Sequence, residues 1–349
     1  MNLQELLSQI KPLDQKAMEQ CQRRWDSIAK PLHSLGKMED FLVKIAGIDG
    51  NAGIDLEKKA LIVMCADNGV VEEGVTQTGQ EVTAIVSENF LDKKASASLL
   101  CSMTGADIYP VDIGIASDTR IMNRKIAYGT KNMTKGPAMT REEAERAVLV
   151  GIDLVRELKE QGYRIIATGE MGIGNTTTSS AIVSVFLNRQ AEEVTGRGAG
   201  LSTEGLNRKI HAIKRAIALN HPDPKDGIDT LAKVGGLDLA GLAGVFLGGA
   251  IYRVPVVLDG FISASAALAA SVIHPLAKEY MLPSHVSKEP AAKMVLEALG
   301  LEAGLHMDMC LGEGTGAVTL FPILDLAAGI YHTMSTFQDI NVEEYKPLA

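Results

Sequence analysis

The sequence predicts an α/β protein in which a parallel sheet is flanked by helices. Three observations support this fold class. Fully apolar stretches such as residues 60–65 have the composition of strands buried on both faces. These stretches alternate with helical patterns along the middle of the chain, as in a parallel sheet. The glycines, 34 in all, cluster where the predicted strands end and form no low-complexity repeat.

Each predicted element has its own local signal. Leu3, Leu6, Leu7 and Ile10 recur at helical spacing, and Asp14 can cap a second helix, so the first 48 residues are predicted to be helical. Apolar runs predict strands at residues 60–65, 106–113, 165–168, 254–258 and 280–285, although a proline weakens the second of these. Helical periodicity predicts helices at residues 83–91, 95–101, 141–158, 181–187, 207–219, 228–234, 237–250, 263–274 and 318–331.

Residues 164–181, RIIATGEMGIGNTTTSSA, are the segment around which the rest of the chain is organised. A strand, a glycine-rich turn and a helix N-terminus can together hold an anion, because unpaired N–H groups point at the ligand. Asn175 and Thr176 add polar side chains suited to a helix start. Glu170 lies in the same turn, which is unusual for a loop that only binds phosphate. The spacing matches neither common nucleotide fingerprint, and an ordinary strand-to-helix turn remains an equal alternative.

A second glutamate lies between glycines near the other end of the chain. Glu313 is the third residue of LGEGTGA at residues 311–317, directly before an apolar helical pattern. A carboxylate in a tight, partly apolar turn can be desolvated, which raises its pKa toward neutrality and suits it to acid/base chemistry. Glu313 could instead cap the helix that follows. The seven histidines show no metal-type pairing, so no metal site is expected.

Composition excludes several classes of protein. The net charge of −9 argues against a nucleic-acid partner, which requires a basic surface. Four scattered cysteines without a C-x-x-C motif are expected to be reduced thiols of a cytoplasmic protein. The first residues lack the pattern of a signal peptide, and no apolar stretch approaches the length of about 20 residues that spans a membrane.

Six motifs occur along the chain and closely resemble one enzyme family. They are KPLHSLGKMED (30–40), ADNGVVEEGVT (66–76), GEMGIGNTTTSSA (169–181), KVGGLDLAGLAGV (233–245), VLDGFISASAAL (257–268) and LGEGTGA (311–317). Together they are similar to the nicotinate-nucleotide:dimethylbenzimidazole phosphoribosyltransferase family of cobalamin lower-ligand assembly. The similarity extends over nearly the whole chain.

The resemblance implies a reaction and an architecture. Phosphoribose would pass from nicotinate mononucleotide to 5,6-dimethylbenzimidazole, giving α-ribazole 5′-phosphate and nicotinate with inversion at C1′. The pyridinium would leave as a neutral ring, so we expect neither a metal nor another cofactor. The implied fold is a Rossmann-like parallel sheet in a homodimer. A small helical domain would contain residues 1–50, about 285–310 and 335–349, and a large α/β domain about 51–284 and 311–334.

The resemblance also assigns residues. Glu313 matches the family's catalytic base, which would take the proton from one benzimidazole nitrogen so that the other attacks C1′. Glu170 matches a second carboxylate in the base pocket and is expected to be catalytic as well, by polar contact or as a backup in proton handling. The residues expected to bind substrate, with Lys209 at the phosphate and Thr78, Val86 and Leu311 at the benzimidazole, are Thr78, Val86, Met171, Gly172, Asn175, Thr176, Gly200, Lys209, Asp259, Ser287, Leu311 and Gly312.

Two departures from the family pattern leave the acceptor open. Asn68 stands where the family usually has histidine, and Val86 stands where some members carry glutamine. Both are expected near the acceptor, so a purine or a phenol remains an alternative to dimethylbenzimidazole. A non-catalytic nucleotide sensor or one half of a heteromeric transferase also remains open. A Rossmann-type oxidoreductase is disfavoured, because the chain lacks G-x-G-x-x-G followed by an acid.

Overall fold

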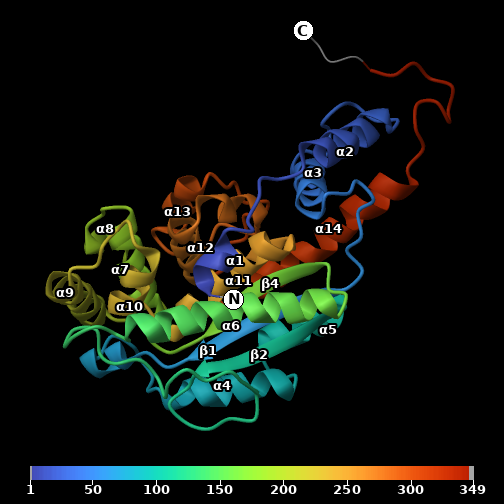
Figure 1. Cartoon of the computed structure of the whole chain (residues 1–349). Coiled ribbons are helices and arrows are strands. Elements are labelled where there is room, and N and C mark those ends of the chain that lie inside the picture. Colours follow the sequence, from blue (N-terminus) through green and yellow to red (C-terminus); the bar gives the residue numbers. More distant parts are fainter. Residues whose placement is uncertain (1, 346–349) are drawn as a thin grey trace.

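The structure of the protein is a computed structural model, which describes residues 2–345. The described strands form one parallel sheet in the order β3-β2-β1-β4-β5-β6 (Figure 1). The strands are β1 (Lys59–Ala66), β2 (Ala106–Gly114), β3 (Met122–Asn123), β4 (Ile165–Met171), β5 (Val256–Leu258) and β6 (Met281–Pro283). This is the strand order of Rossmann-type sheets. From β1 the chain adds strands first toward one edge of the sheet and then, from β4 on, toward the other edge. The predicted fold class is confirmed.

The central strand β1 shows why the sheet carries helices on both sides. All of its residues are buried. Ile62 and Met64 contribute to the core on one face, whereas Leu61 and Val63 contribute to the core on the other. Alternate side chains of a strand point to opposite faces, so an unbroken apolar run serves two cores at once.

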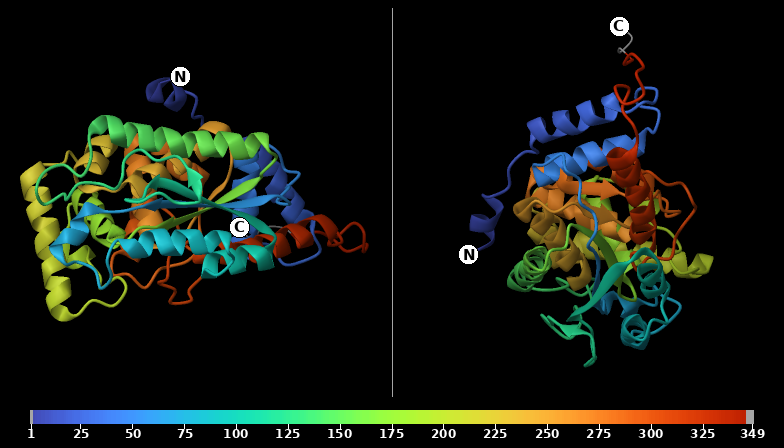
Figure 2. Two further views of the ribbon diagram at one scale, coloured as in Figure 1. Left: turned by 90° about the horizontal axis from the view of Figure 1, so that it is seen from below. Right: turned by 90° about the vertical axis from the view of Figure 1, so that its right-hand side faces the viewer.

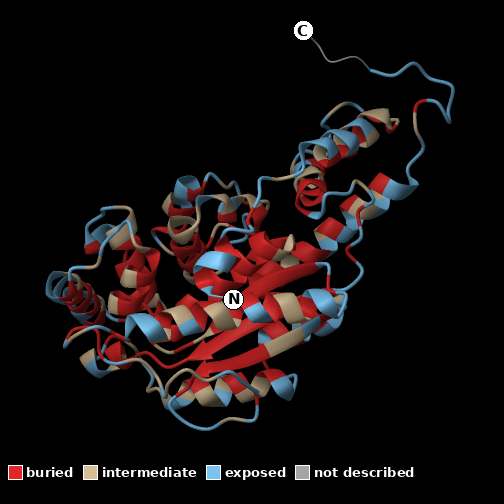
Figure 3. Cartoon of the chain, viewed as in Figure 1, coloured by how far each residue is buried: buried red, intermediate tan, exposed pale blue. Residues whose placement is uncertain are grey.

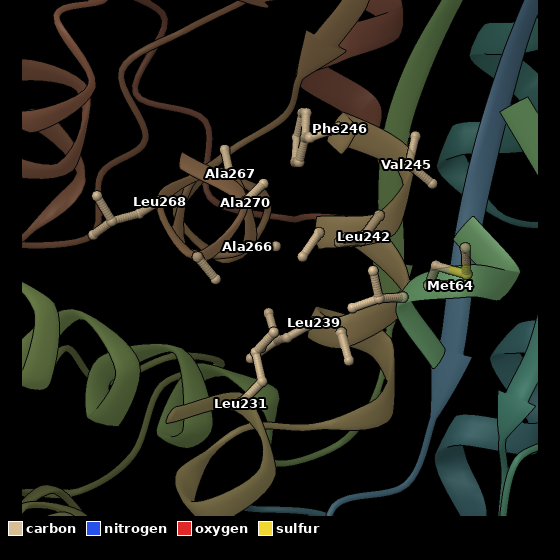
Figure 4. Packing of buried hydrophobic residues seen from close by; sticks show 14 of the residues in the cluster. Met64, Leu231, Leu239, Leu242, Val245, Phe246, Ala266, Ala267, Leu268 and Ala270 are labelled. Atoms are coloured by element: carbon tan, nitrogen blue, oxygen red, sulfur yellow. The ribbon is translucent and has the colours of Figure 1, made fainter. Parts of the chain in front are cut away.

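The first face is covered by α6 and α11, with α7, α10 and α12 beside them. Glycines allow α6 and α11 to approach closely: a Cβ at Gly151 would lie 2.1 Å from the carbonyl oxygen of Gly241. Figure 4 shows leucine and phenylalanine side chains of α11 packed against the alanine-rich helix α12. The helices of this side are α6 (Arg141–Glu160), α7 (Asn175–Phe186), α8 (Ala191–Val194), α9 (Thr203–Asn220), α10 (Gly227–Val234), α11 (Leu237–Tyr252), α12 (Phe261–Ile273) and α13 (Ala292–Leu299).

The second face is covered by α4 (Glu81–Leu91), α5 (Ser96–Thr104) and α14 (Thr315–Thr333). Figure 3 shows the strands between the two helical layers as mostly buried. Short 3₁₀ turns, Gly69–Glu73 and Pro275–Tyr280, follow β1 and precede β6.

Two further helices lie outside the sheet layers, near the end of α14 (Figure 2). They are α2 (Gln15–Ser27) and α3 (Lys37–Asp49), which pack on each other, while α3 also packs on α14. The short α1 (Leu3–Leu7) contacts α11, and α13 contacts α12. The division into a small helical domain and a large domain stays a prediction. No helix between residues 2 and 345 is long and apolar enough to cross a membrane.

Several element boundaries differ from the prediction for physical reasons. The strands predicted at 254–258 and 280–285 shorten to three residues each, since only those residues pair within the sheet, while His285 forms an isolated bridge with Leu305. Helix α9 begins at Thr203, earlier than predicted, because Ser202 caps it through the N–H of Gly205. Pro110 is tolerated inside β2 because β3 pairs only with Val111 and Asp112.

Candidate active site

A cavity of about 320 Å³ opens at the carboxyl edge of the sheet, beside the point where the strand order reverses. Ligands of open α/β sheets bind at this edge, and the volume lies in the range of small-molecule sites. Its walls come from the ends of β4 and β5, the loop after β6, and the loop before α14. The lining residues are Val86, Glu170, Met171, Gly172, Ile173, Asn175, Thr176, Gly198, Ala199, Asp259, Gly260, Phe261, Ile262, His285, Ser287, Glu289, Cys310, Leu311, Gly312 and Glu313.

Glu313 enters this cavity from a strained turn. Gly312, Glu313 and Gly314 have φ angles of +92°, +62° and +89°, and a glutamate rarely adopts this left-handed region. Oε2 of Glu313 accepts a hydrogen bond from the N–H of Ala97, in the first turn of α5, at 3.3 Å. Burial raises the pKa of the half-buried Glu313 carboxyl above its ordinary value, an effect that the Ala97 hydrogen bond opposes. The side chain therefore does not cap the helix that follows it.

Asp259 performs that capping instead. Its Oδ1 accepts hydrogen bonds from the N–H groups of Gly316 at 2.8 Å and Ala317 at 3.1 Å, and its Oδ2 accepts one from Gly314 at 3.2 Å. A carboxylate at a helix N-terminus is stabilised by these donors and by the helix dipole. Asp259 thereby fixes the first turn of α14 to the end of β5, while it also lines the cavity.

Glu170 is the second carboxyl of the cavity and lies within β4, not in the turn after it. Its Oε1 accepts the backbone N–H of Glu313 at 3.4 Å, and its Oε2 accepts a hydrogen bond from Nδ2 of Asn175. Burial raises the pKa of Glu170 to about 8, and the negative charge of Asp238 acts in the same direction. The Asn175 amide thus binds a carboxyl group and does not cap α7, whose N-cap is Gly174.

Two glycines bring the two glutamates together. A Cβ at Gly169 would lie 2.4 Å from the carbonyl oxygen of Glu313, and a Cβ at Gly312 would lie 2.5 Å from Oε1 of Glu170. These distances are shorter than any side-chain carbon can occupy. The loop before α14 can therefore rest on β4 only because both positions lack a side chain.

A buried cation lies behind another wall of the cavity. Lys209, in α9, is fully buried, and its Nζ donates hydrogen bonds to Oγ1 of Thr176 at 2.8 Å and to the carbonyl oxygen of Gly196 at 3.2 Å. Burial lowers the pKa of Lys209 to about 8, and Glu289 opposes the shift. Thr176 and Glu289 both line the cavity, so a positive charge lies close beneath its surface.

The structure brings most of the predicted site residues together. Glu170, Glu313, Val86, Met171, Gly172, Asn175, Thr176, Asp259, Ser287, Leu311 and Gly312 all line the cavity. Among the described residues, Thr78, Gly200 and Lys209 are not part of the lining. Thr78 and Gly200 are exposed, on loops that Gln77 joins by a hydrogen bond to the carbonyl of Gly200.

Asn68, expected near the acceptor, does not line the cavity. Asn68 is fully buried behind the glycine-rich turn, where a Cβ at Gly172 or Gly174 would lie 3.1 or 3.3 Å from its side chain. It can influence a ligand only through its neighbours. Thr176 reaches the cavity, whereas the next two threonines, Thr177 and Thr178, are buried in α7.

Sequence reasoning missed several lining residues. Phe261 and His285 follow β5 and β6, so their position after a strand was an available signal. His285 is buried, which lowers its pKa, and its Nδ1 lies 3.0 Å from Oγ of Ser284. The other missed residues are Ile173, Gly198, Ala199, Gly260, Ile262, Glu289 and Cys310. Among these, Gly260 also follows β5, and Gly198 and Ala199 lie in the glycine-rich run 196–200. Across residues 2–345, no group of three or more His, Cys, Asp or Glu side chains is placed to hold a metal ion.

Comparison with known proteins decides the family. Residues 10–342 match the phosphoribosyltransferase family. The nicotinate-nucleotide–dimethylbenzimidazole phosphoribosyltransferase of Acetivibrio thermocellus is 51% identical over 346 residues, which cover 98% of this chain and 99% of that protein. The chain belongs to the nicotinate-nucleotide–dimethylbenzimidazole phosphoribosyltransferase family.

Other members of the family agree with this result. The enzyme of the same name from Clostridium acetobutylicum is 49% identical over 351 residues, covering 100% of both chains. The solved structure of CobT from Thermus thermophilus superposes with a TM-score of 0.89 at 39% identity, covering 95% of this chain and 100% of that one. The family predicted from the six sequence motifs is confirmed.

Proposed function

We propose that the protein transfers 5-phosphoribose from nicotinate mononucleotide to 5,6-dimethylbenzimidazole, giving α-ribazole 5′-phosphate and nicotinate. The observation that carries the proposal is the carboxylate of Glu313, fixed at the cavity by a left-handed backbone and by the N–H of Ala97. A base held in one place suits a reaction that must choose one of two ring nitrogens. The names of the curated relatives support the same reaction.

Glu313 acts as the general base. Its ionised carboxylate accepts the proton from one nitrogen of the benzimidazole, and the lone pair of the other nitrogen attacks C1′ of the ribose. The bond between C1′ and the pyridinium nitrogen breaks, and its electron pair returns to the ring, which leaves as neutral pyridine carrying its carboxylate. Attack from the opposite side inverts C1′ and converts the β-nucleotide into the α-product. The raised pKa of Glu313 strengthens it as a base at neutral pH.

The remaining walls suit the two substrates. Thr176 contributes its hydroxyl to the wall and the positive charge of Lys209 lies directly behind it, which suits this part of the site to the 5′-phosphate of the nucleotide. Val86, Met171 and Leu311 form an apolar part of the lining, which suits a flat aromatic acceptor. Glu170 holds the turn of Glu313 by accepting its backbone N–H.

A homodimer in the cytoplasm is the assembly and location proposed for this reaction. Ile85 on α4 and Leu99 and Met103 on α5 are 59%, 46% and 79% exposed, and they could bury apolar surface against a second copy. Light scattering during size-exclusion chromatography would test the dimer, and a monomer at micromolar concentration would contradict it.

The cysteines support the proposed location. Cys21, Cys65, Cys101 and Cys310 are all free thiols, as in a reducing compartment.

The reaction can be tested directly. The protein is incubated with nicotinate mononucleotide and, separately, dimethylbenzimidazole, adenine and phenol, without added metal, and nicotinate release is followed by chromatography. We expect release that requires dimethylbenzimidazole and collapses in Glu313→Gln. If nicotinate were released only with adenine or phenol, the phosphoribosyl transfer would stand and the proposed acceptor would change. No release with any acceptor, in a protein that binds the nucleotide, would overturn the proposal.

A further inference from the structure

A second buried carboxyl lies behind Glu170 and has no part in the reaction described so far. Asp238, in the first turn of α11, is fully buried. Nδ2 of Asn175 donates one hydrogen bond to Oδ2 of Asp238 at 3.1 Å and another to Oε2 of Glu170. The Oδ1 atom of Asp238 accepts the N–H of Leu239 at 2.9 Å. One amide group therefore joins two buried carboxyls.

The groups around this pair are mostly acidic or neutral. Asp259 faces Glu170 from the end of β5, Glu313 faces it from the loop before α14, and the amide of Asn68 faces Asp238 from the end of β1. His285 lies beyond Asp259 and is itself disfavoured as a cation by burial. Among residues 2–345, no lysine or arginine forms a hydrogen bond or an ion pair with Glu170 or Asp238.

Two buried carboxyls that share one hydrogen-bond donor cannot both remain ionised without a large free-energy cost. One proton is therefore retained by the pair. Burial raises the pKa of both carboxyls. Asp238 lies in the first turn of α11, where the helix dipole stabilises a negative charge, so the proton resides on Glu170. Glu170 also lines the cavity, whereas Asp238 does not.

We propose that Asp238, tied to Glu170 by the Asn175 amide, is a positioning residue whose negative charge keeps Glu170 neutral and able to donate a hydrogen bond to the ligand. This inference rests on the proposed function. The two glutamates then have different tasks: Glu313 is ionised and takes a proton, and Glu170 carries one. Nicotinate mononucleotide brings both a phosphate and a carboxylate into the cavity, and a neutral Glu170 removes one negative charge that would repel them.

Infrared difference spectroscopy of the ligand-free protein tests the proton directly. The spectrum of the wild type minus that of Glu170→Gln should contain the C=O stretch of a protonated carboxyl at neutral pH. The band should disappear as pH rises through about 8. Absence of the band at neutral pH would overturn the proposal. Because no substrate is present, this result stands whether or not nicotinate release is observed.

Two variants test the role of Asp238. Loss of its charge in Asp238→Asn should lower the midpoint of the Glu170 band by about one pH unit. Asn175→Ala removes a donor that favours the ionised form of Glu170, so it should raise the midpoint. A folded Asp238→Asn with an unchanged midpoint would overturn the proposal, as would a lowered midpoint in Asn175→Ala. Thermal unfolding establishes that each variant is folded.

A matched control removes a buried carboxylate elsewhere. Asp112 is buried at the end of β2, where it accepts hydrogen bonds from the N–H of Ile115 and the hydroxyl of Thr119 and pairs with Lys125. Asp112→Asn should destabilise the fold and leave the Glu170 midpoint in place. If Asp238 had a purely structural role, Asp238→Asn would likewise destabilise the fold and leave the Glu170 midpoint unchanged. That outcome would contradict the proposal.

Discussion

The backbone N–H of Glu313 donates a hydrogen bond to Oε1 of Glu170, with an N···O distance of 3.4 Å. The two residues are 143 positions apart in the chain, yet each belongs to a glycine-rich segment that can approach the other closely. The Glu170 carboxyl therefore helps to fix the backbone of the turn from which the Glu313 side chain extends. Substitutions at either glutamate, or at the glycines where the two segments touch, should affect the proton transfer assigned to Glu313.

Glu313→Gln should lower kcat by about 10²- to 10⁴-fold, because the amide cannot take the proton from the attacking base. The side chains are equal in size, and glutamine can still accept the N–H of Ala97, so the turn should persist. Steady-state kinetics measures kcat, and equilibrium binding of nicotinate mononucleotide should change little. A variant that retains most of its kcat would transfer the role of base to another group, with Glu170 the nearest candidate.

Gly169→Ala should impair catalysis without touching a catalytic side chain. The added Cβ would meet the carbonyl of Glu313 at 2.4 Å, so the loop before α14 must move away from β4. We expect at least a tenfold fall in kcat, which is on the order of the effect of a misplaced catalytic group, and a loss of about 1–3 kcal/mol in the free energy of unfolding.

Gly329→Ala is the matched control for this substitution. Gly329 lies in α14, and its added Cβ would have no neighbour within 4 Å. Alanine in a helix is about 0.5–1 kcal/mol more favourable than glycine, so this variant should be slightly more stable and fully active. If Gly169→Ala and Gly329→Ala had equal kcat values, the close contact between Gly169 and the Glu313 loop would not be needed for catalysis.

Much of the fold could be predicted because its elements carry strong local patterns. The strand β1 is a continuous apolar run, and Thr140 and Glu143 form the capping box that begins α6. The two-residue strand β3 has no such pattern and was not predicted as a strand. Its position is set by pairing with β2, which is a tertiary effect.

The site was less accessible to sequence reasoning. The motifs identified Glu170 and Glu313, but the donor to Glu313 is a backbone group of Ala97, 216 positions away, and backbone donors have no sequence signature. Asp238 did carry a signal, because it is an acidic residue at the start of an otherwise apolar helix. Its connection to Glu170 through Asn175 appears only when three elements meet.

Lys209→Met should weaken binding of the nucleotide more than it slows the reaction. Methionine matches the length of the buried lysine stem and lacks its charge. Loss of the positive charge behind Thr176 should raise KM for nicotinate mononucleotide by about ten- to a hundredfold. Lys214→Met on the same helix is the control, because Lys214 is exposed and pairs with Glu192 at the surface. A lower kcat with unchanged KM would argue against a role for the Lys209 charge in phosphate binding.

Glu170 should make the protein less stable as pH rises. Its pKa is about 8 in the folded protein and near its ordinary value of 4.5 when unfolded, so between these values the folded state binds more protons. The stability that the protonated group contributes is complete below pH 4.5 and is lost as pH rises through 8. Relative to Glu170→Gln, the free energy of unfolding of the wild type should fall across this window, by at most about 1.4 kcal/mol per pH unit.

Urea denaturation at a series of pH values measures this difference. Glu88→Gln provides a control of opposite sign, because hydrogen bonds from Arg120 hold the pKa of the Glu88 carboxyl below its ordinary value. The stability that Glu88 contributes is present above its ordinary pKa and is lost as pH falls. The free energy of unfolding of the wild type should therefore rise relative to that of Glu88→Gln as pH rises. If the Glu170→Gln difference ran in the same direction as the Glu88→Gln difference, Glu170 would be ionised in the folded protein, and the neutral Glu170 inferred from its pairing with Asp238 would be wrong.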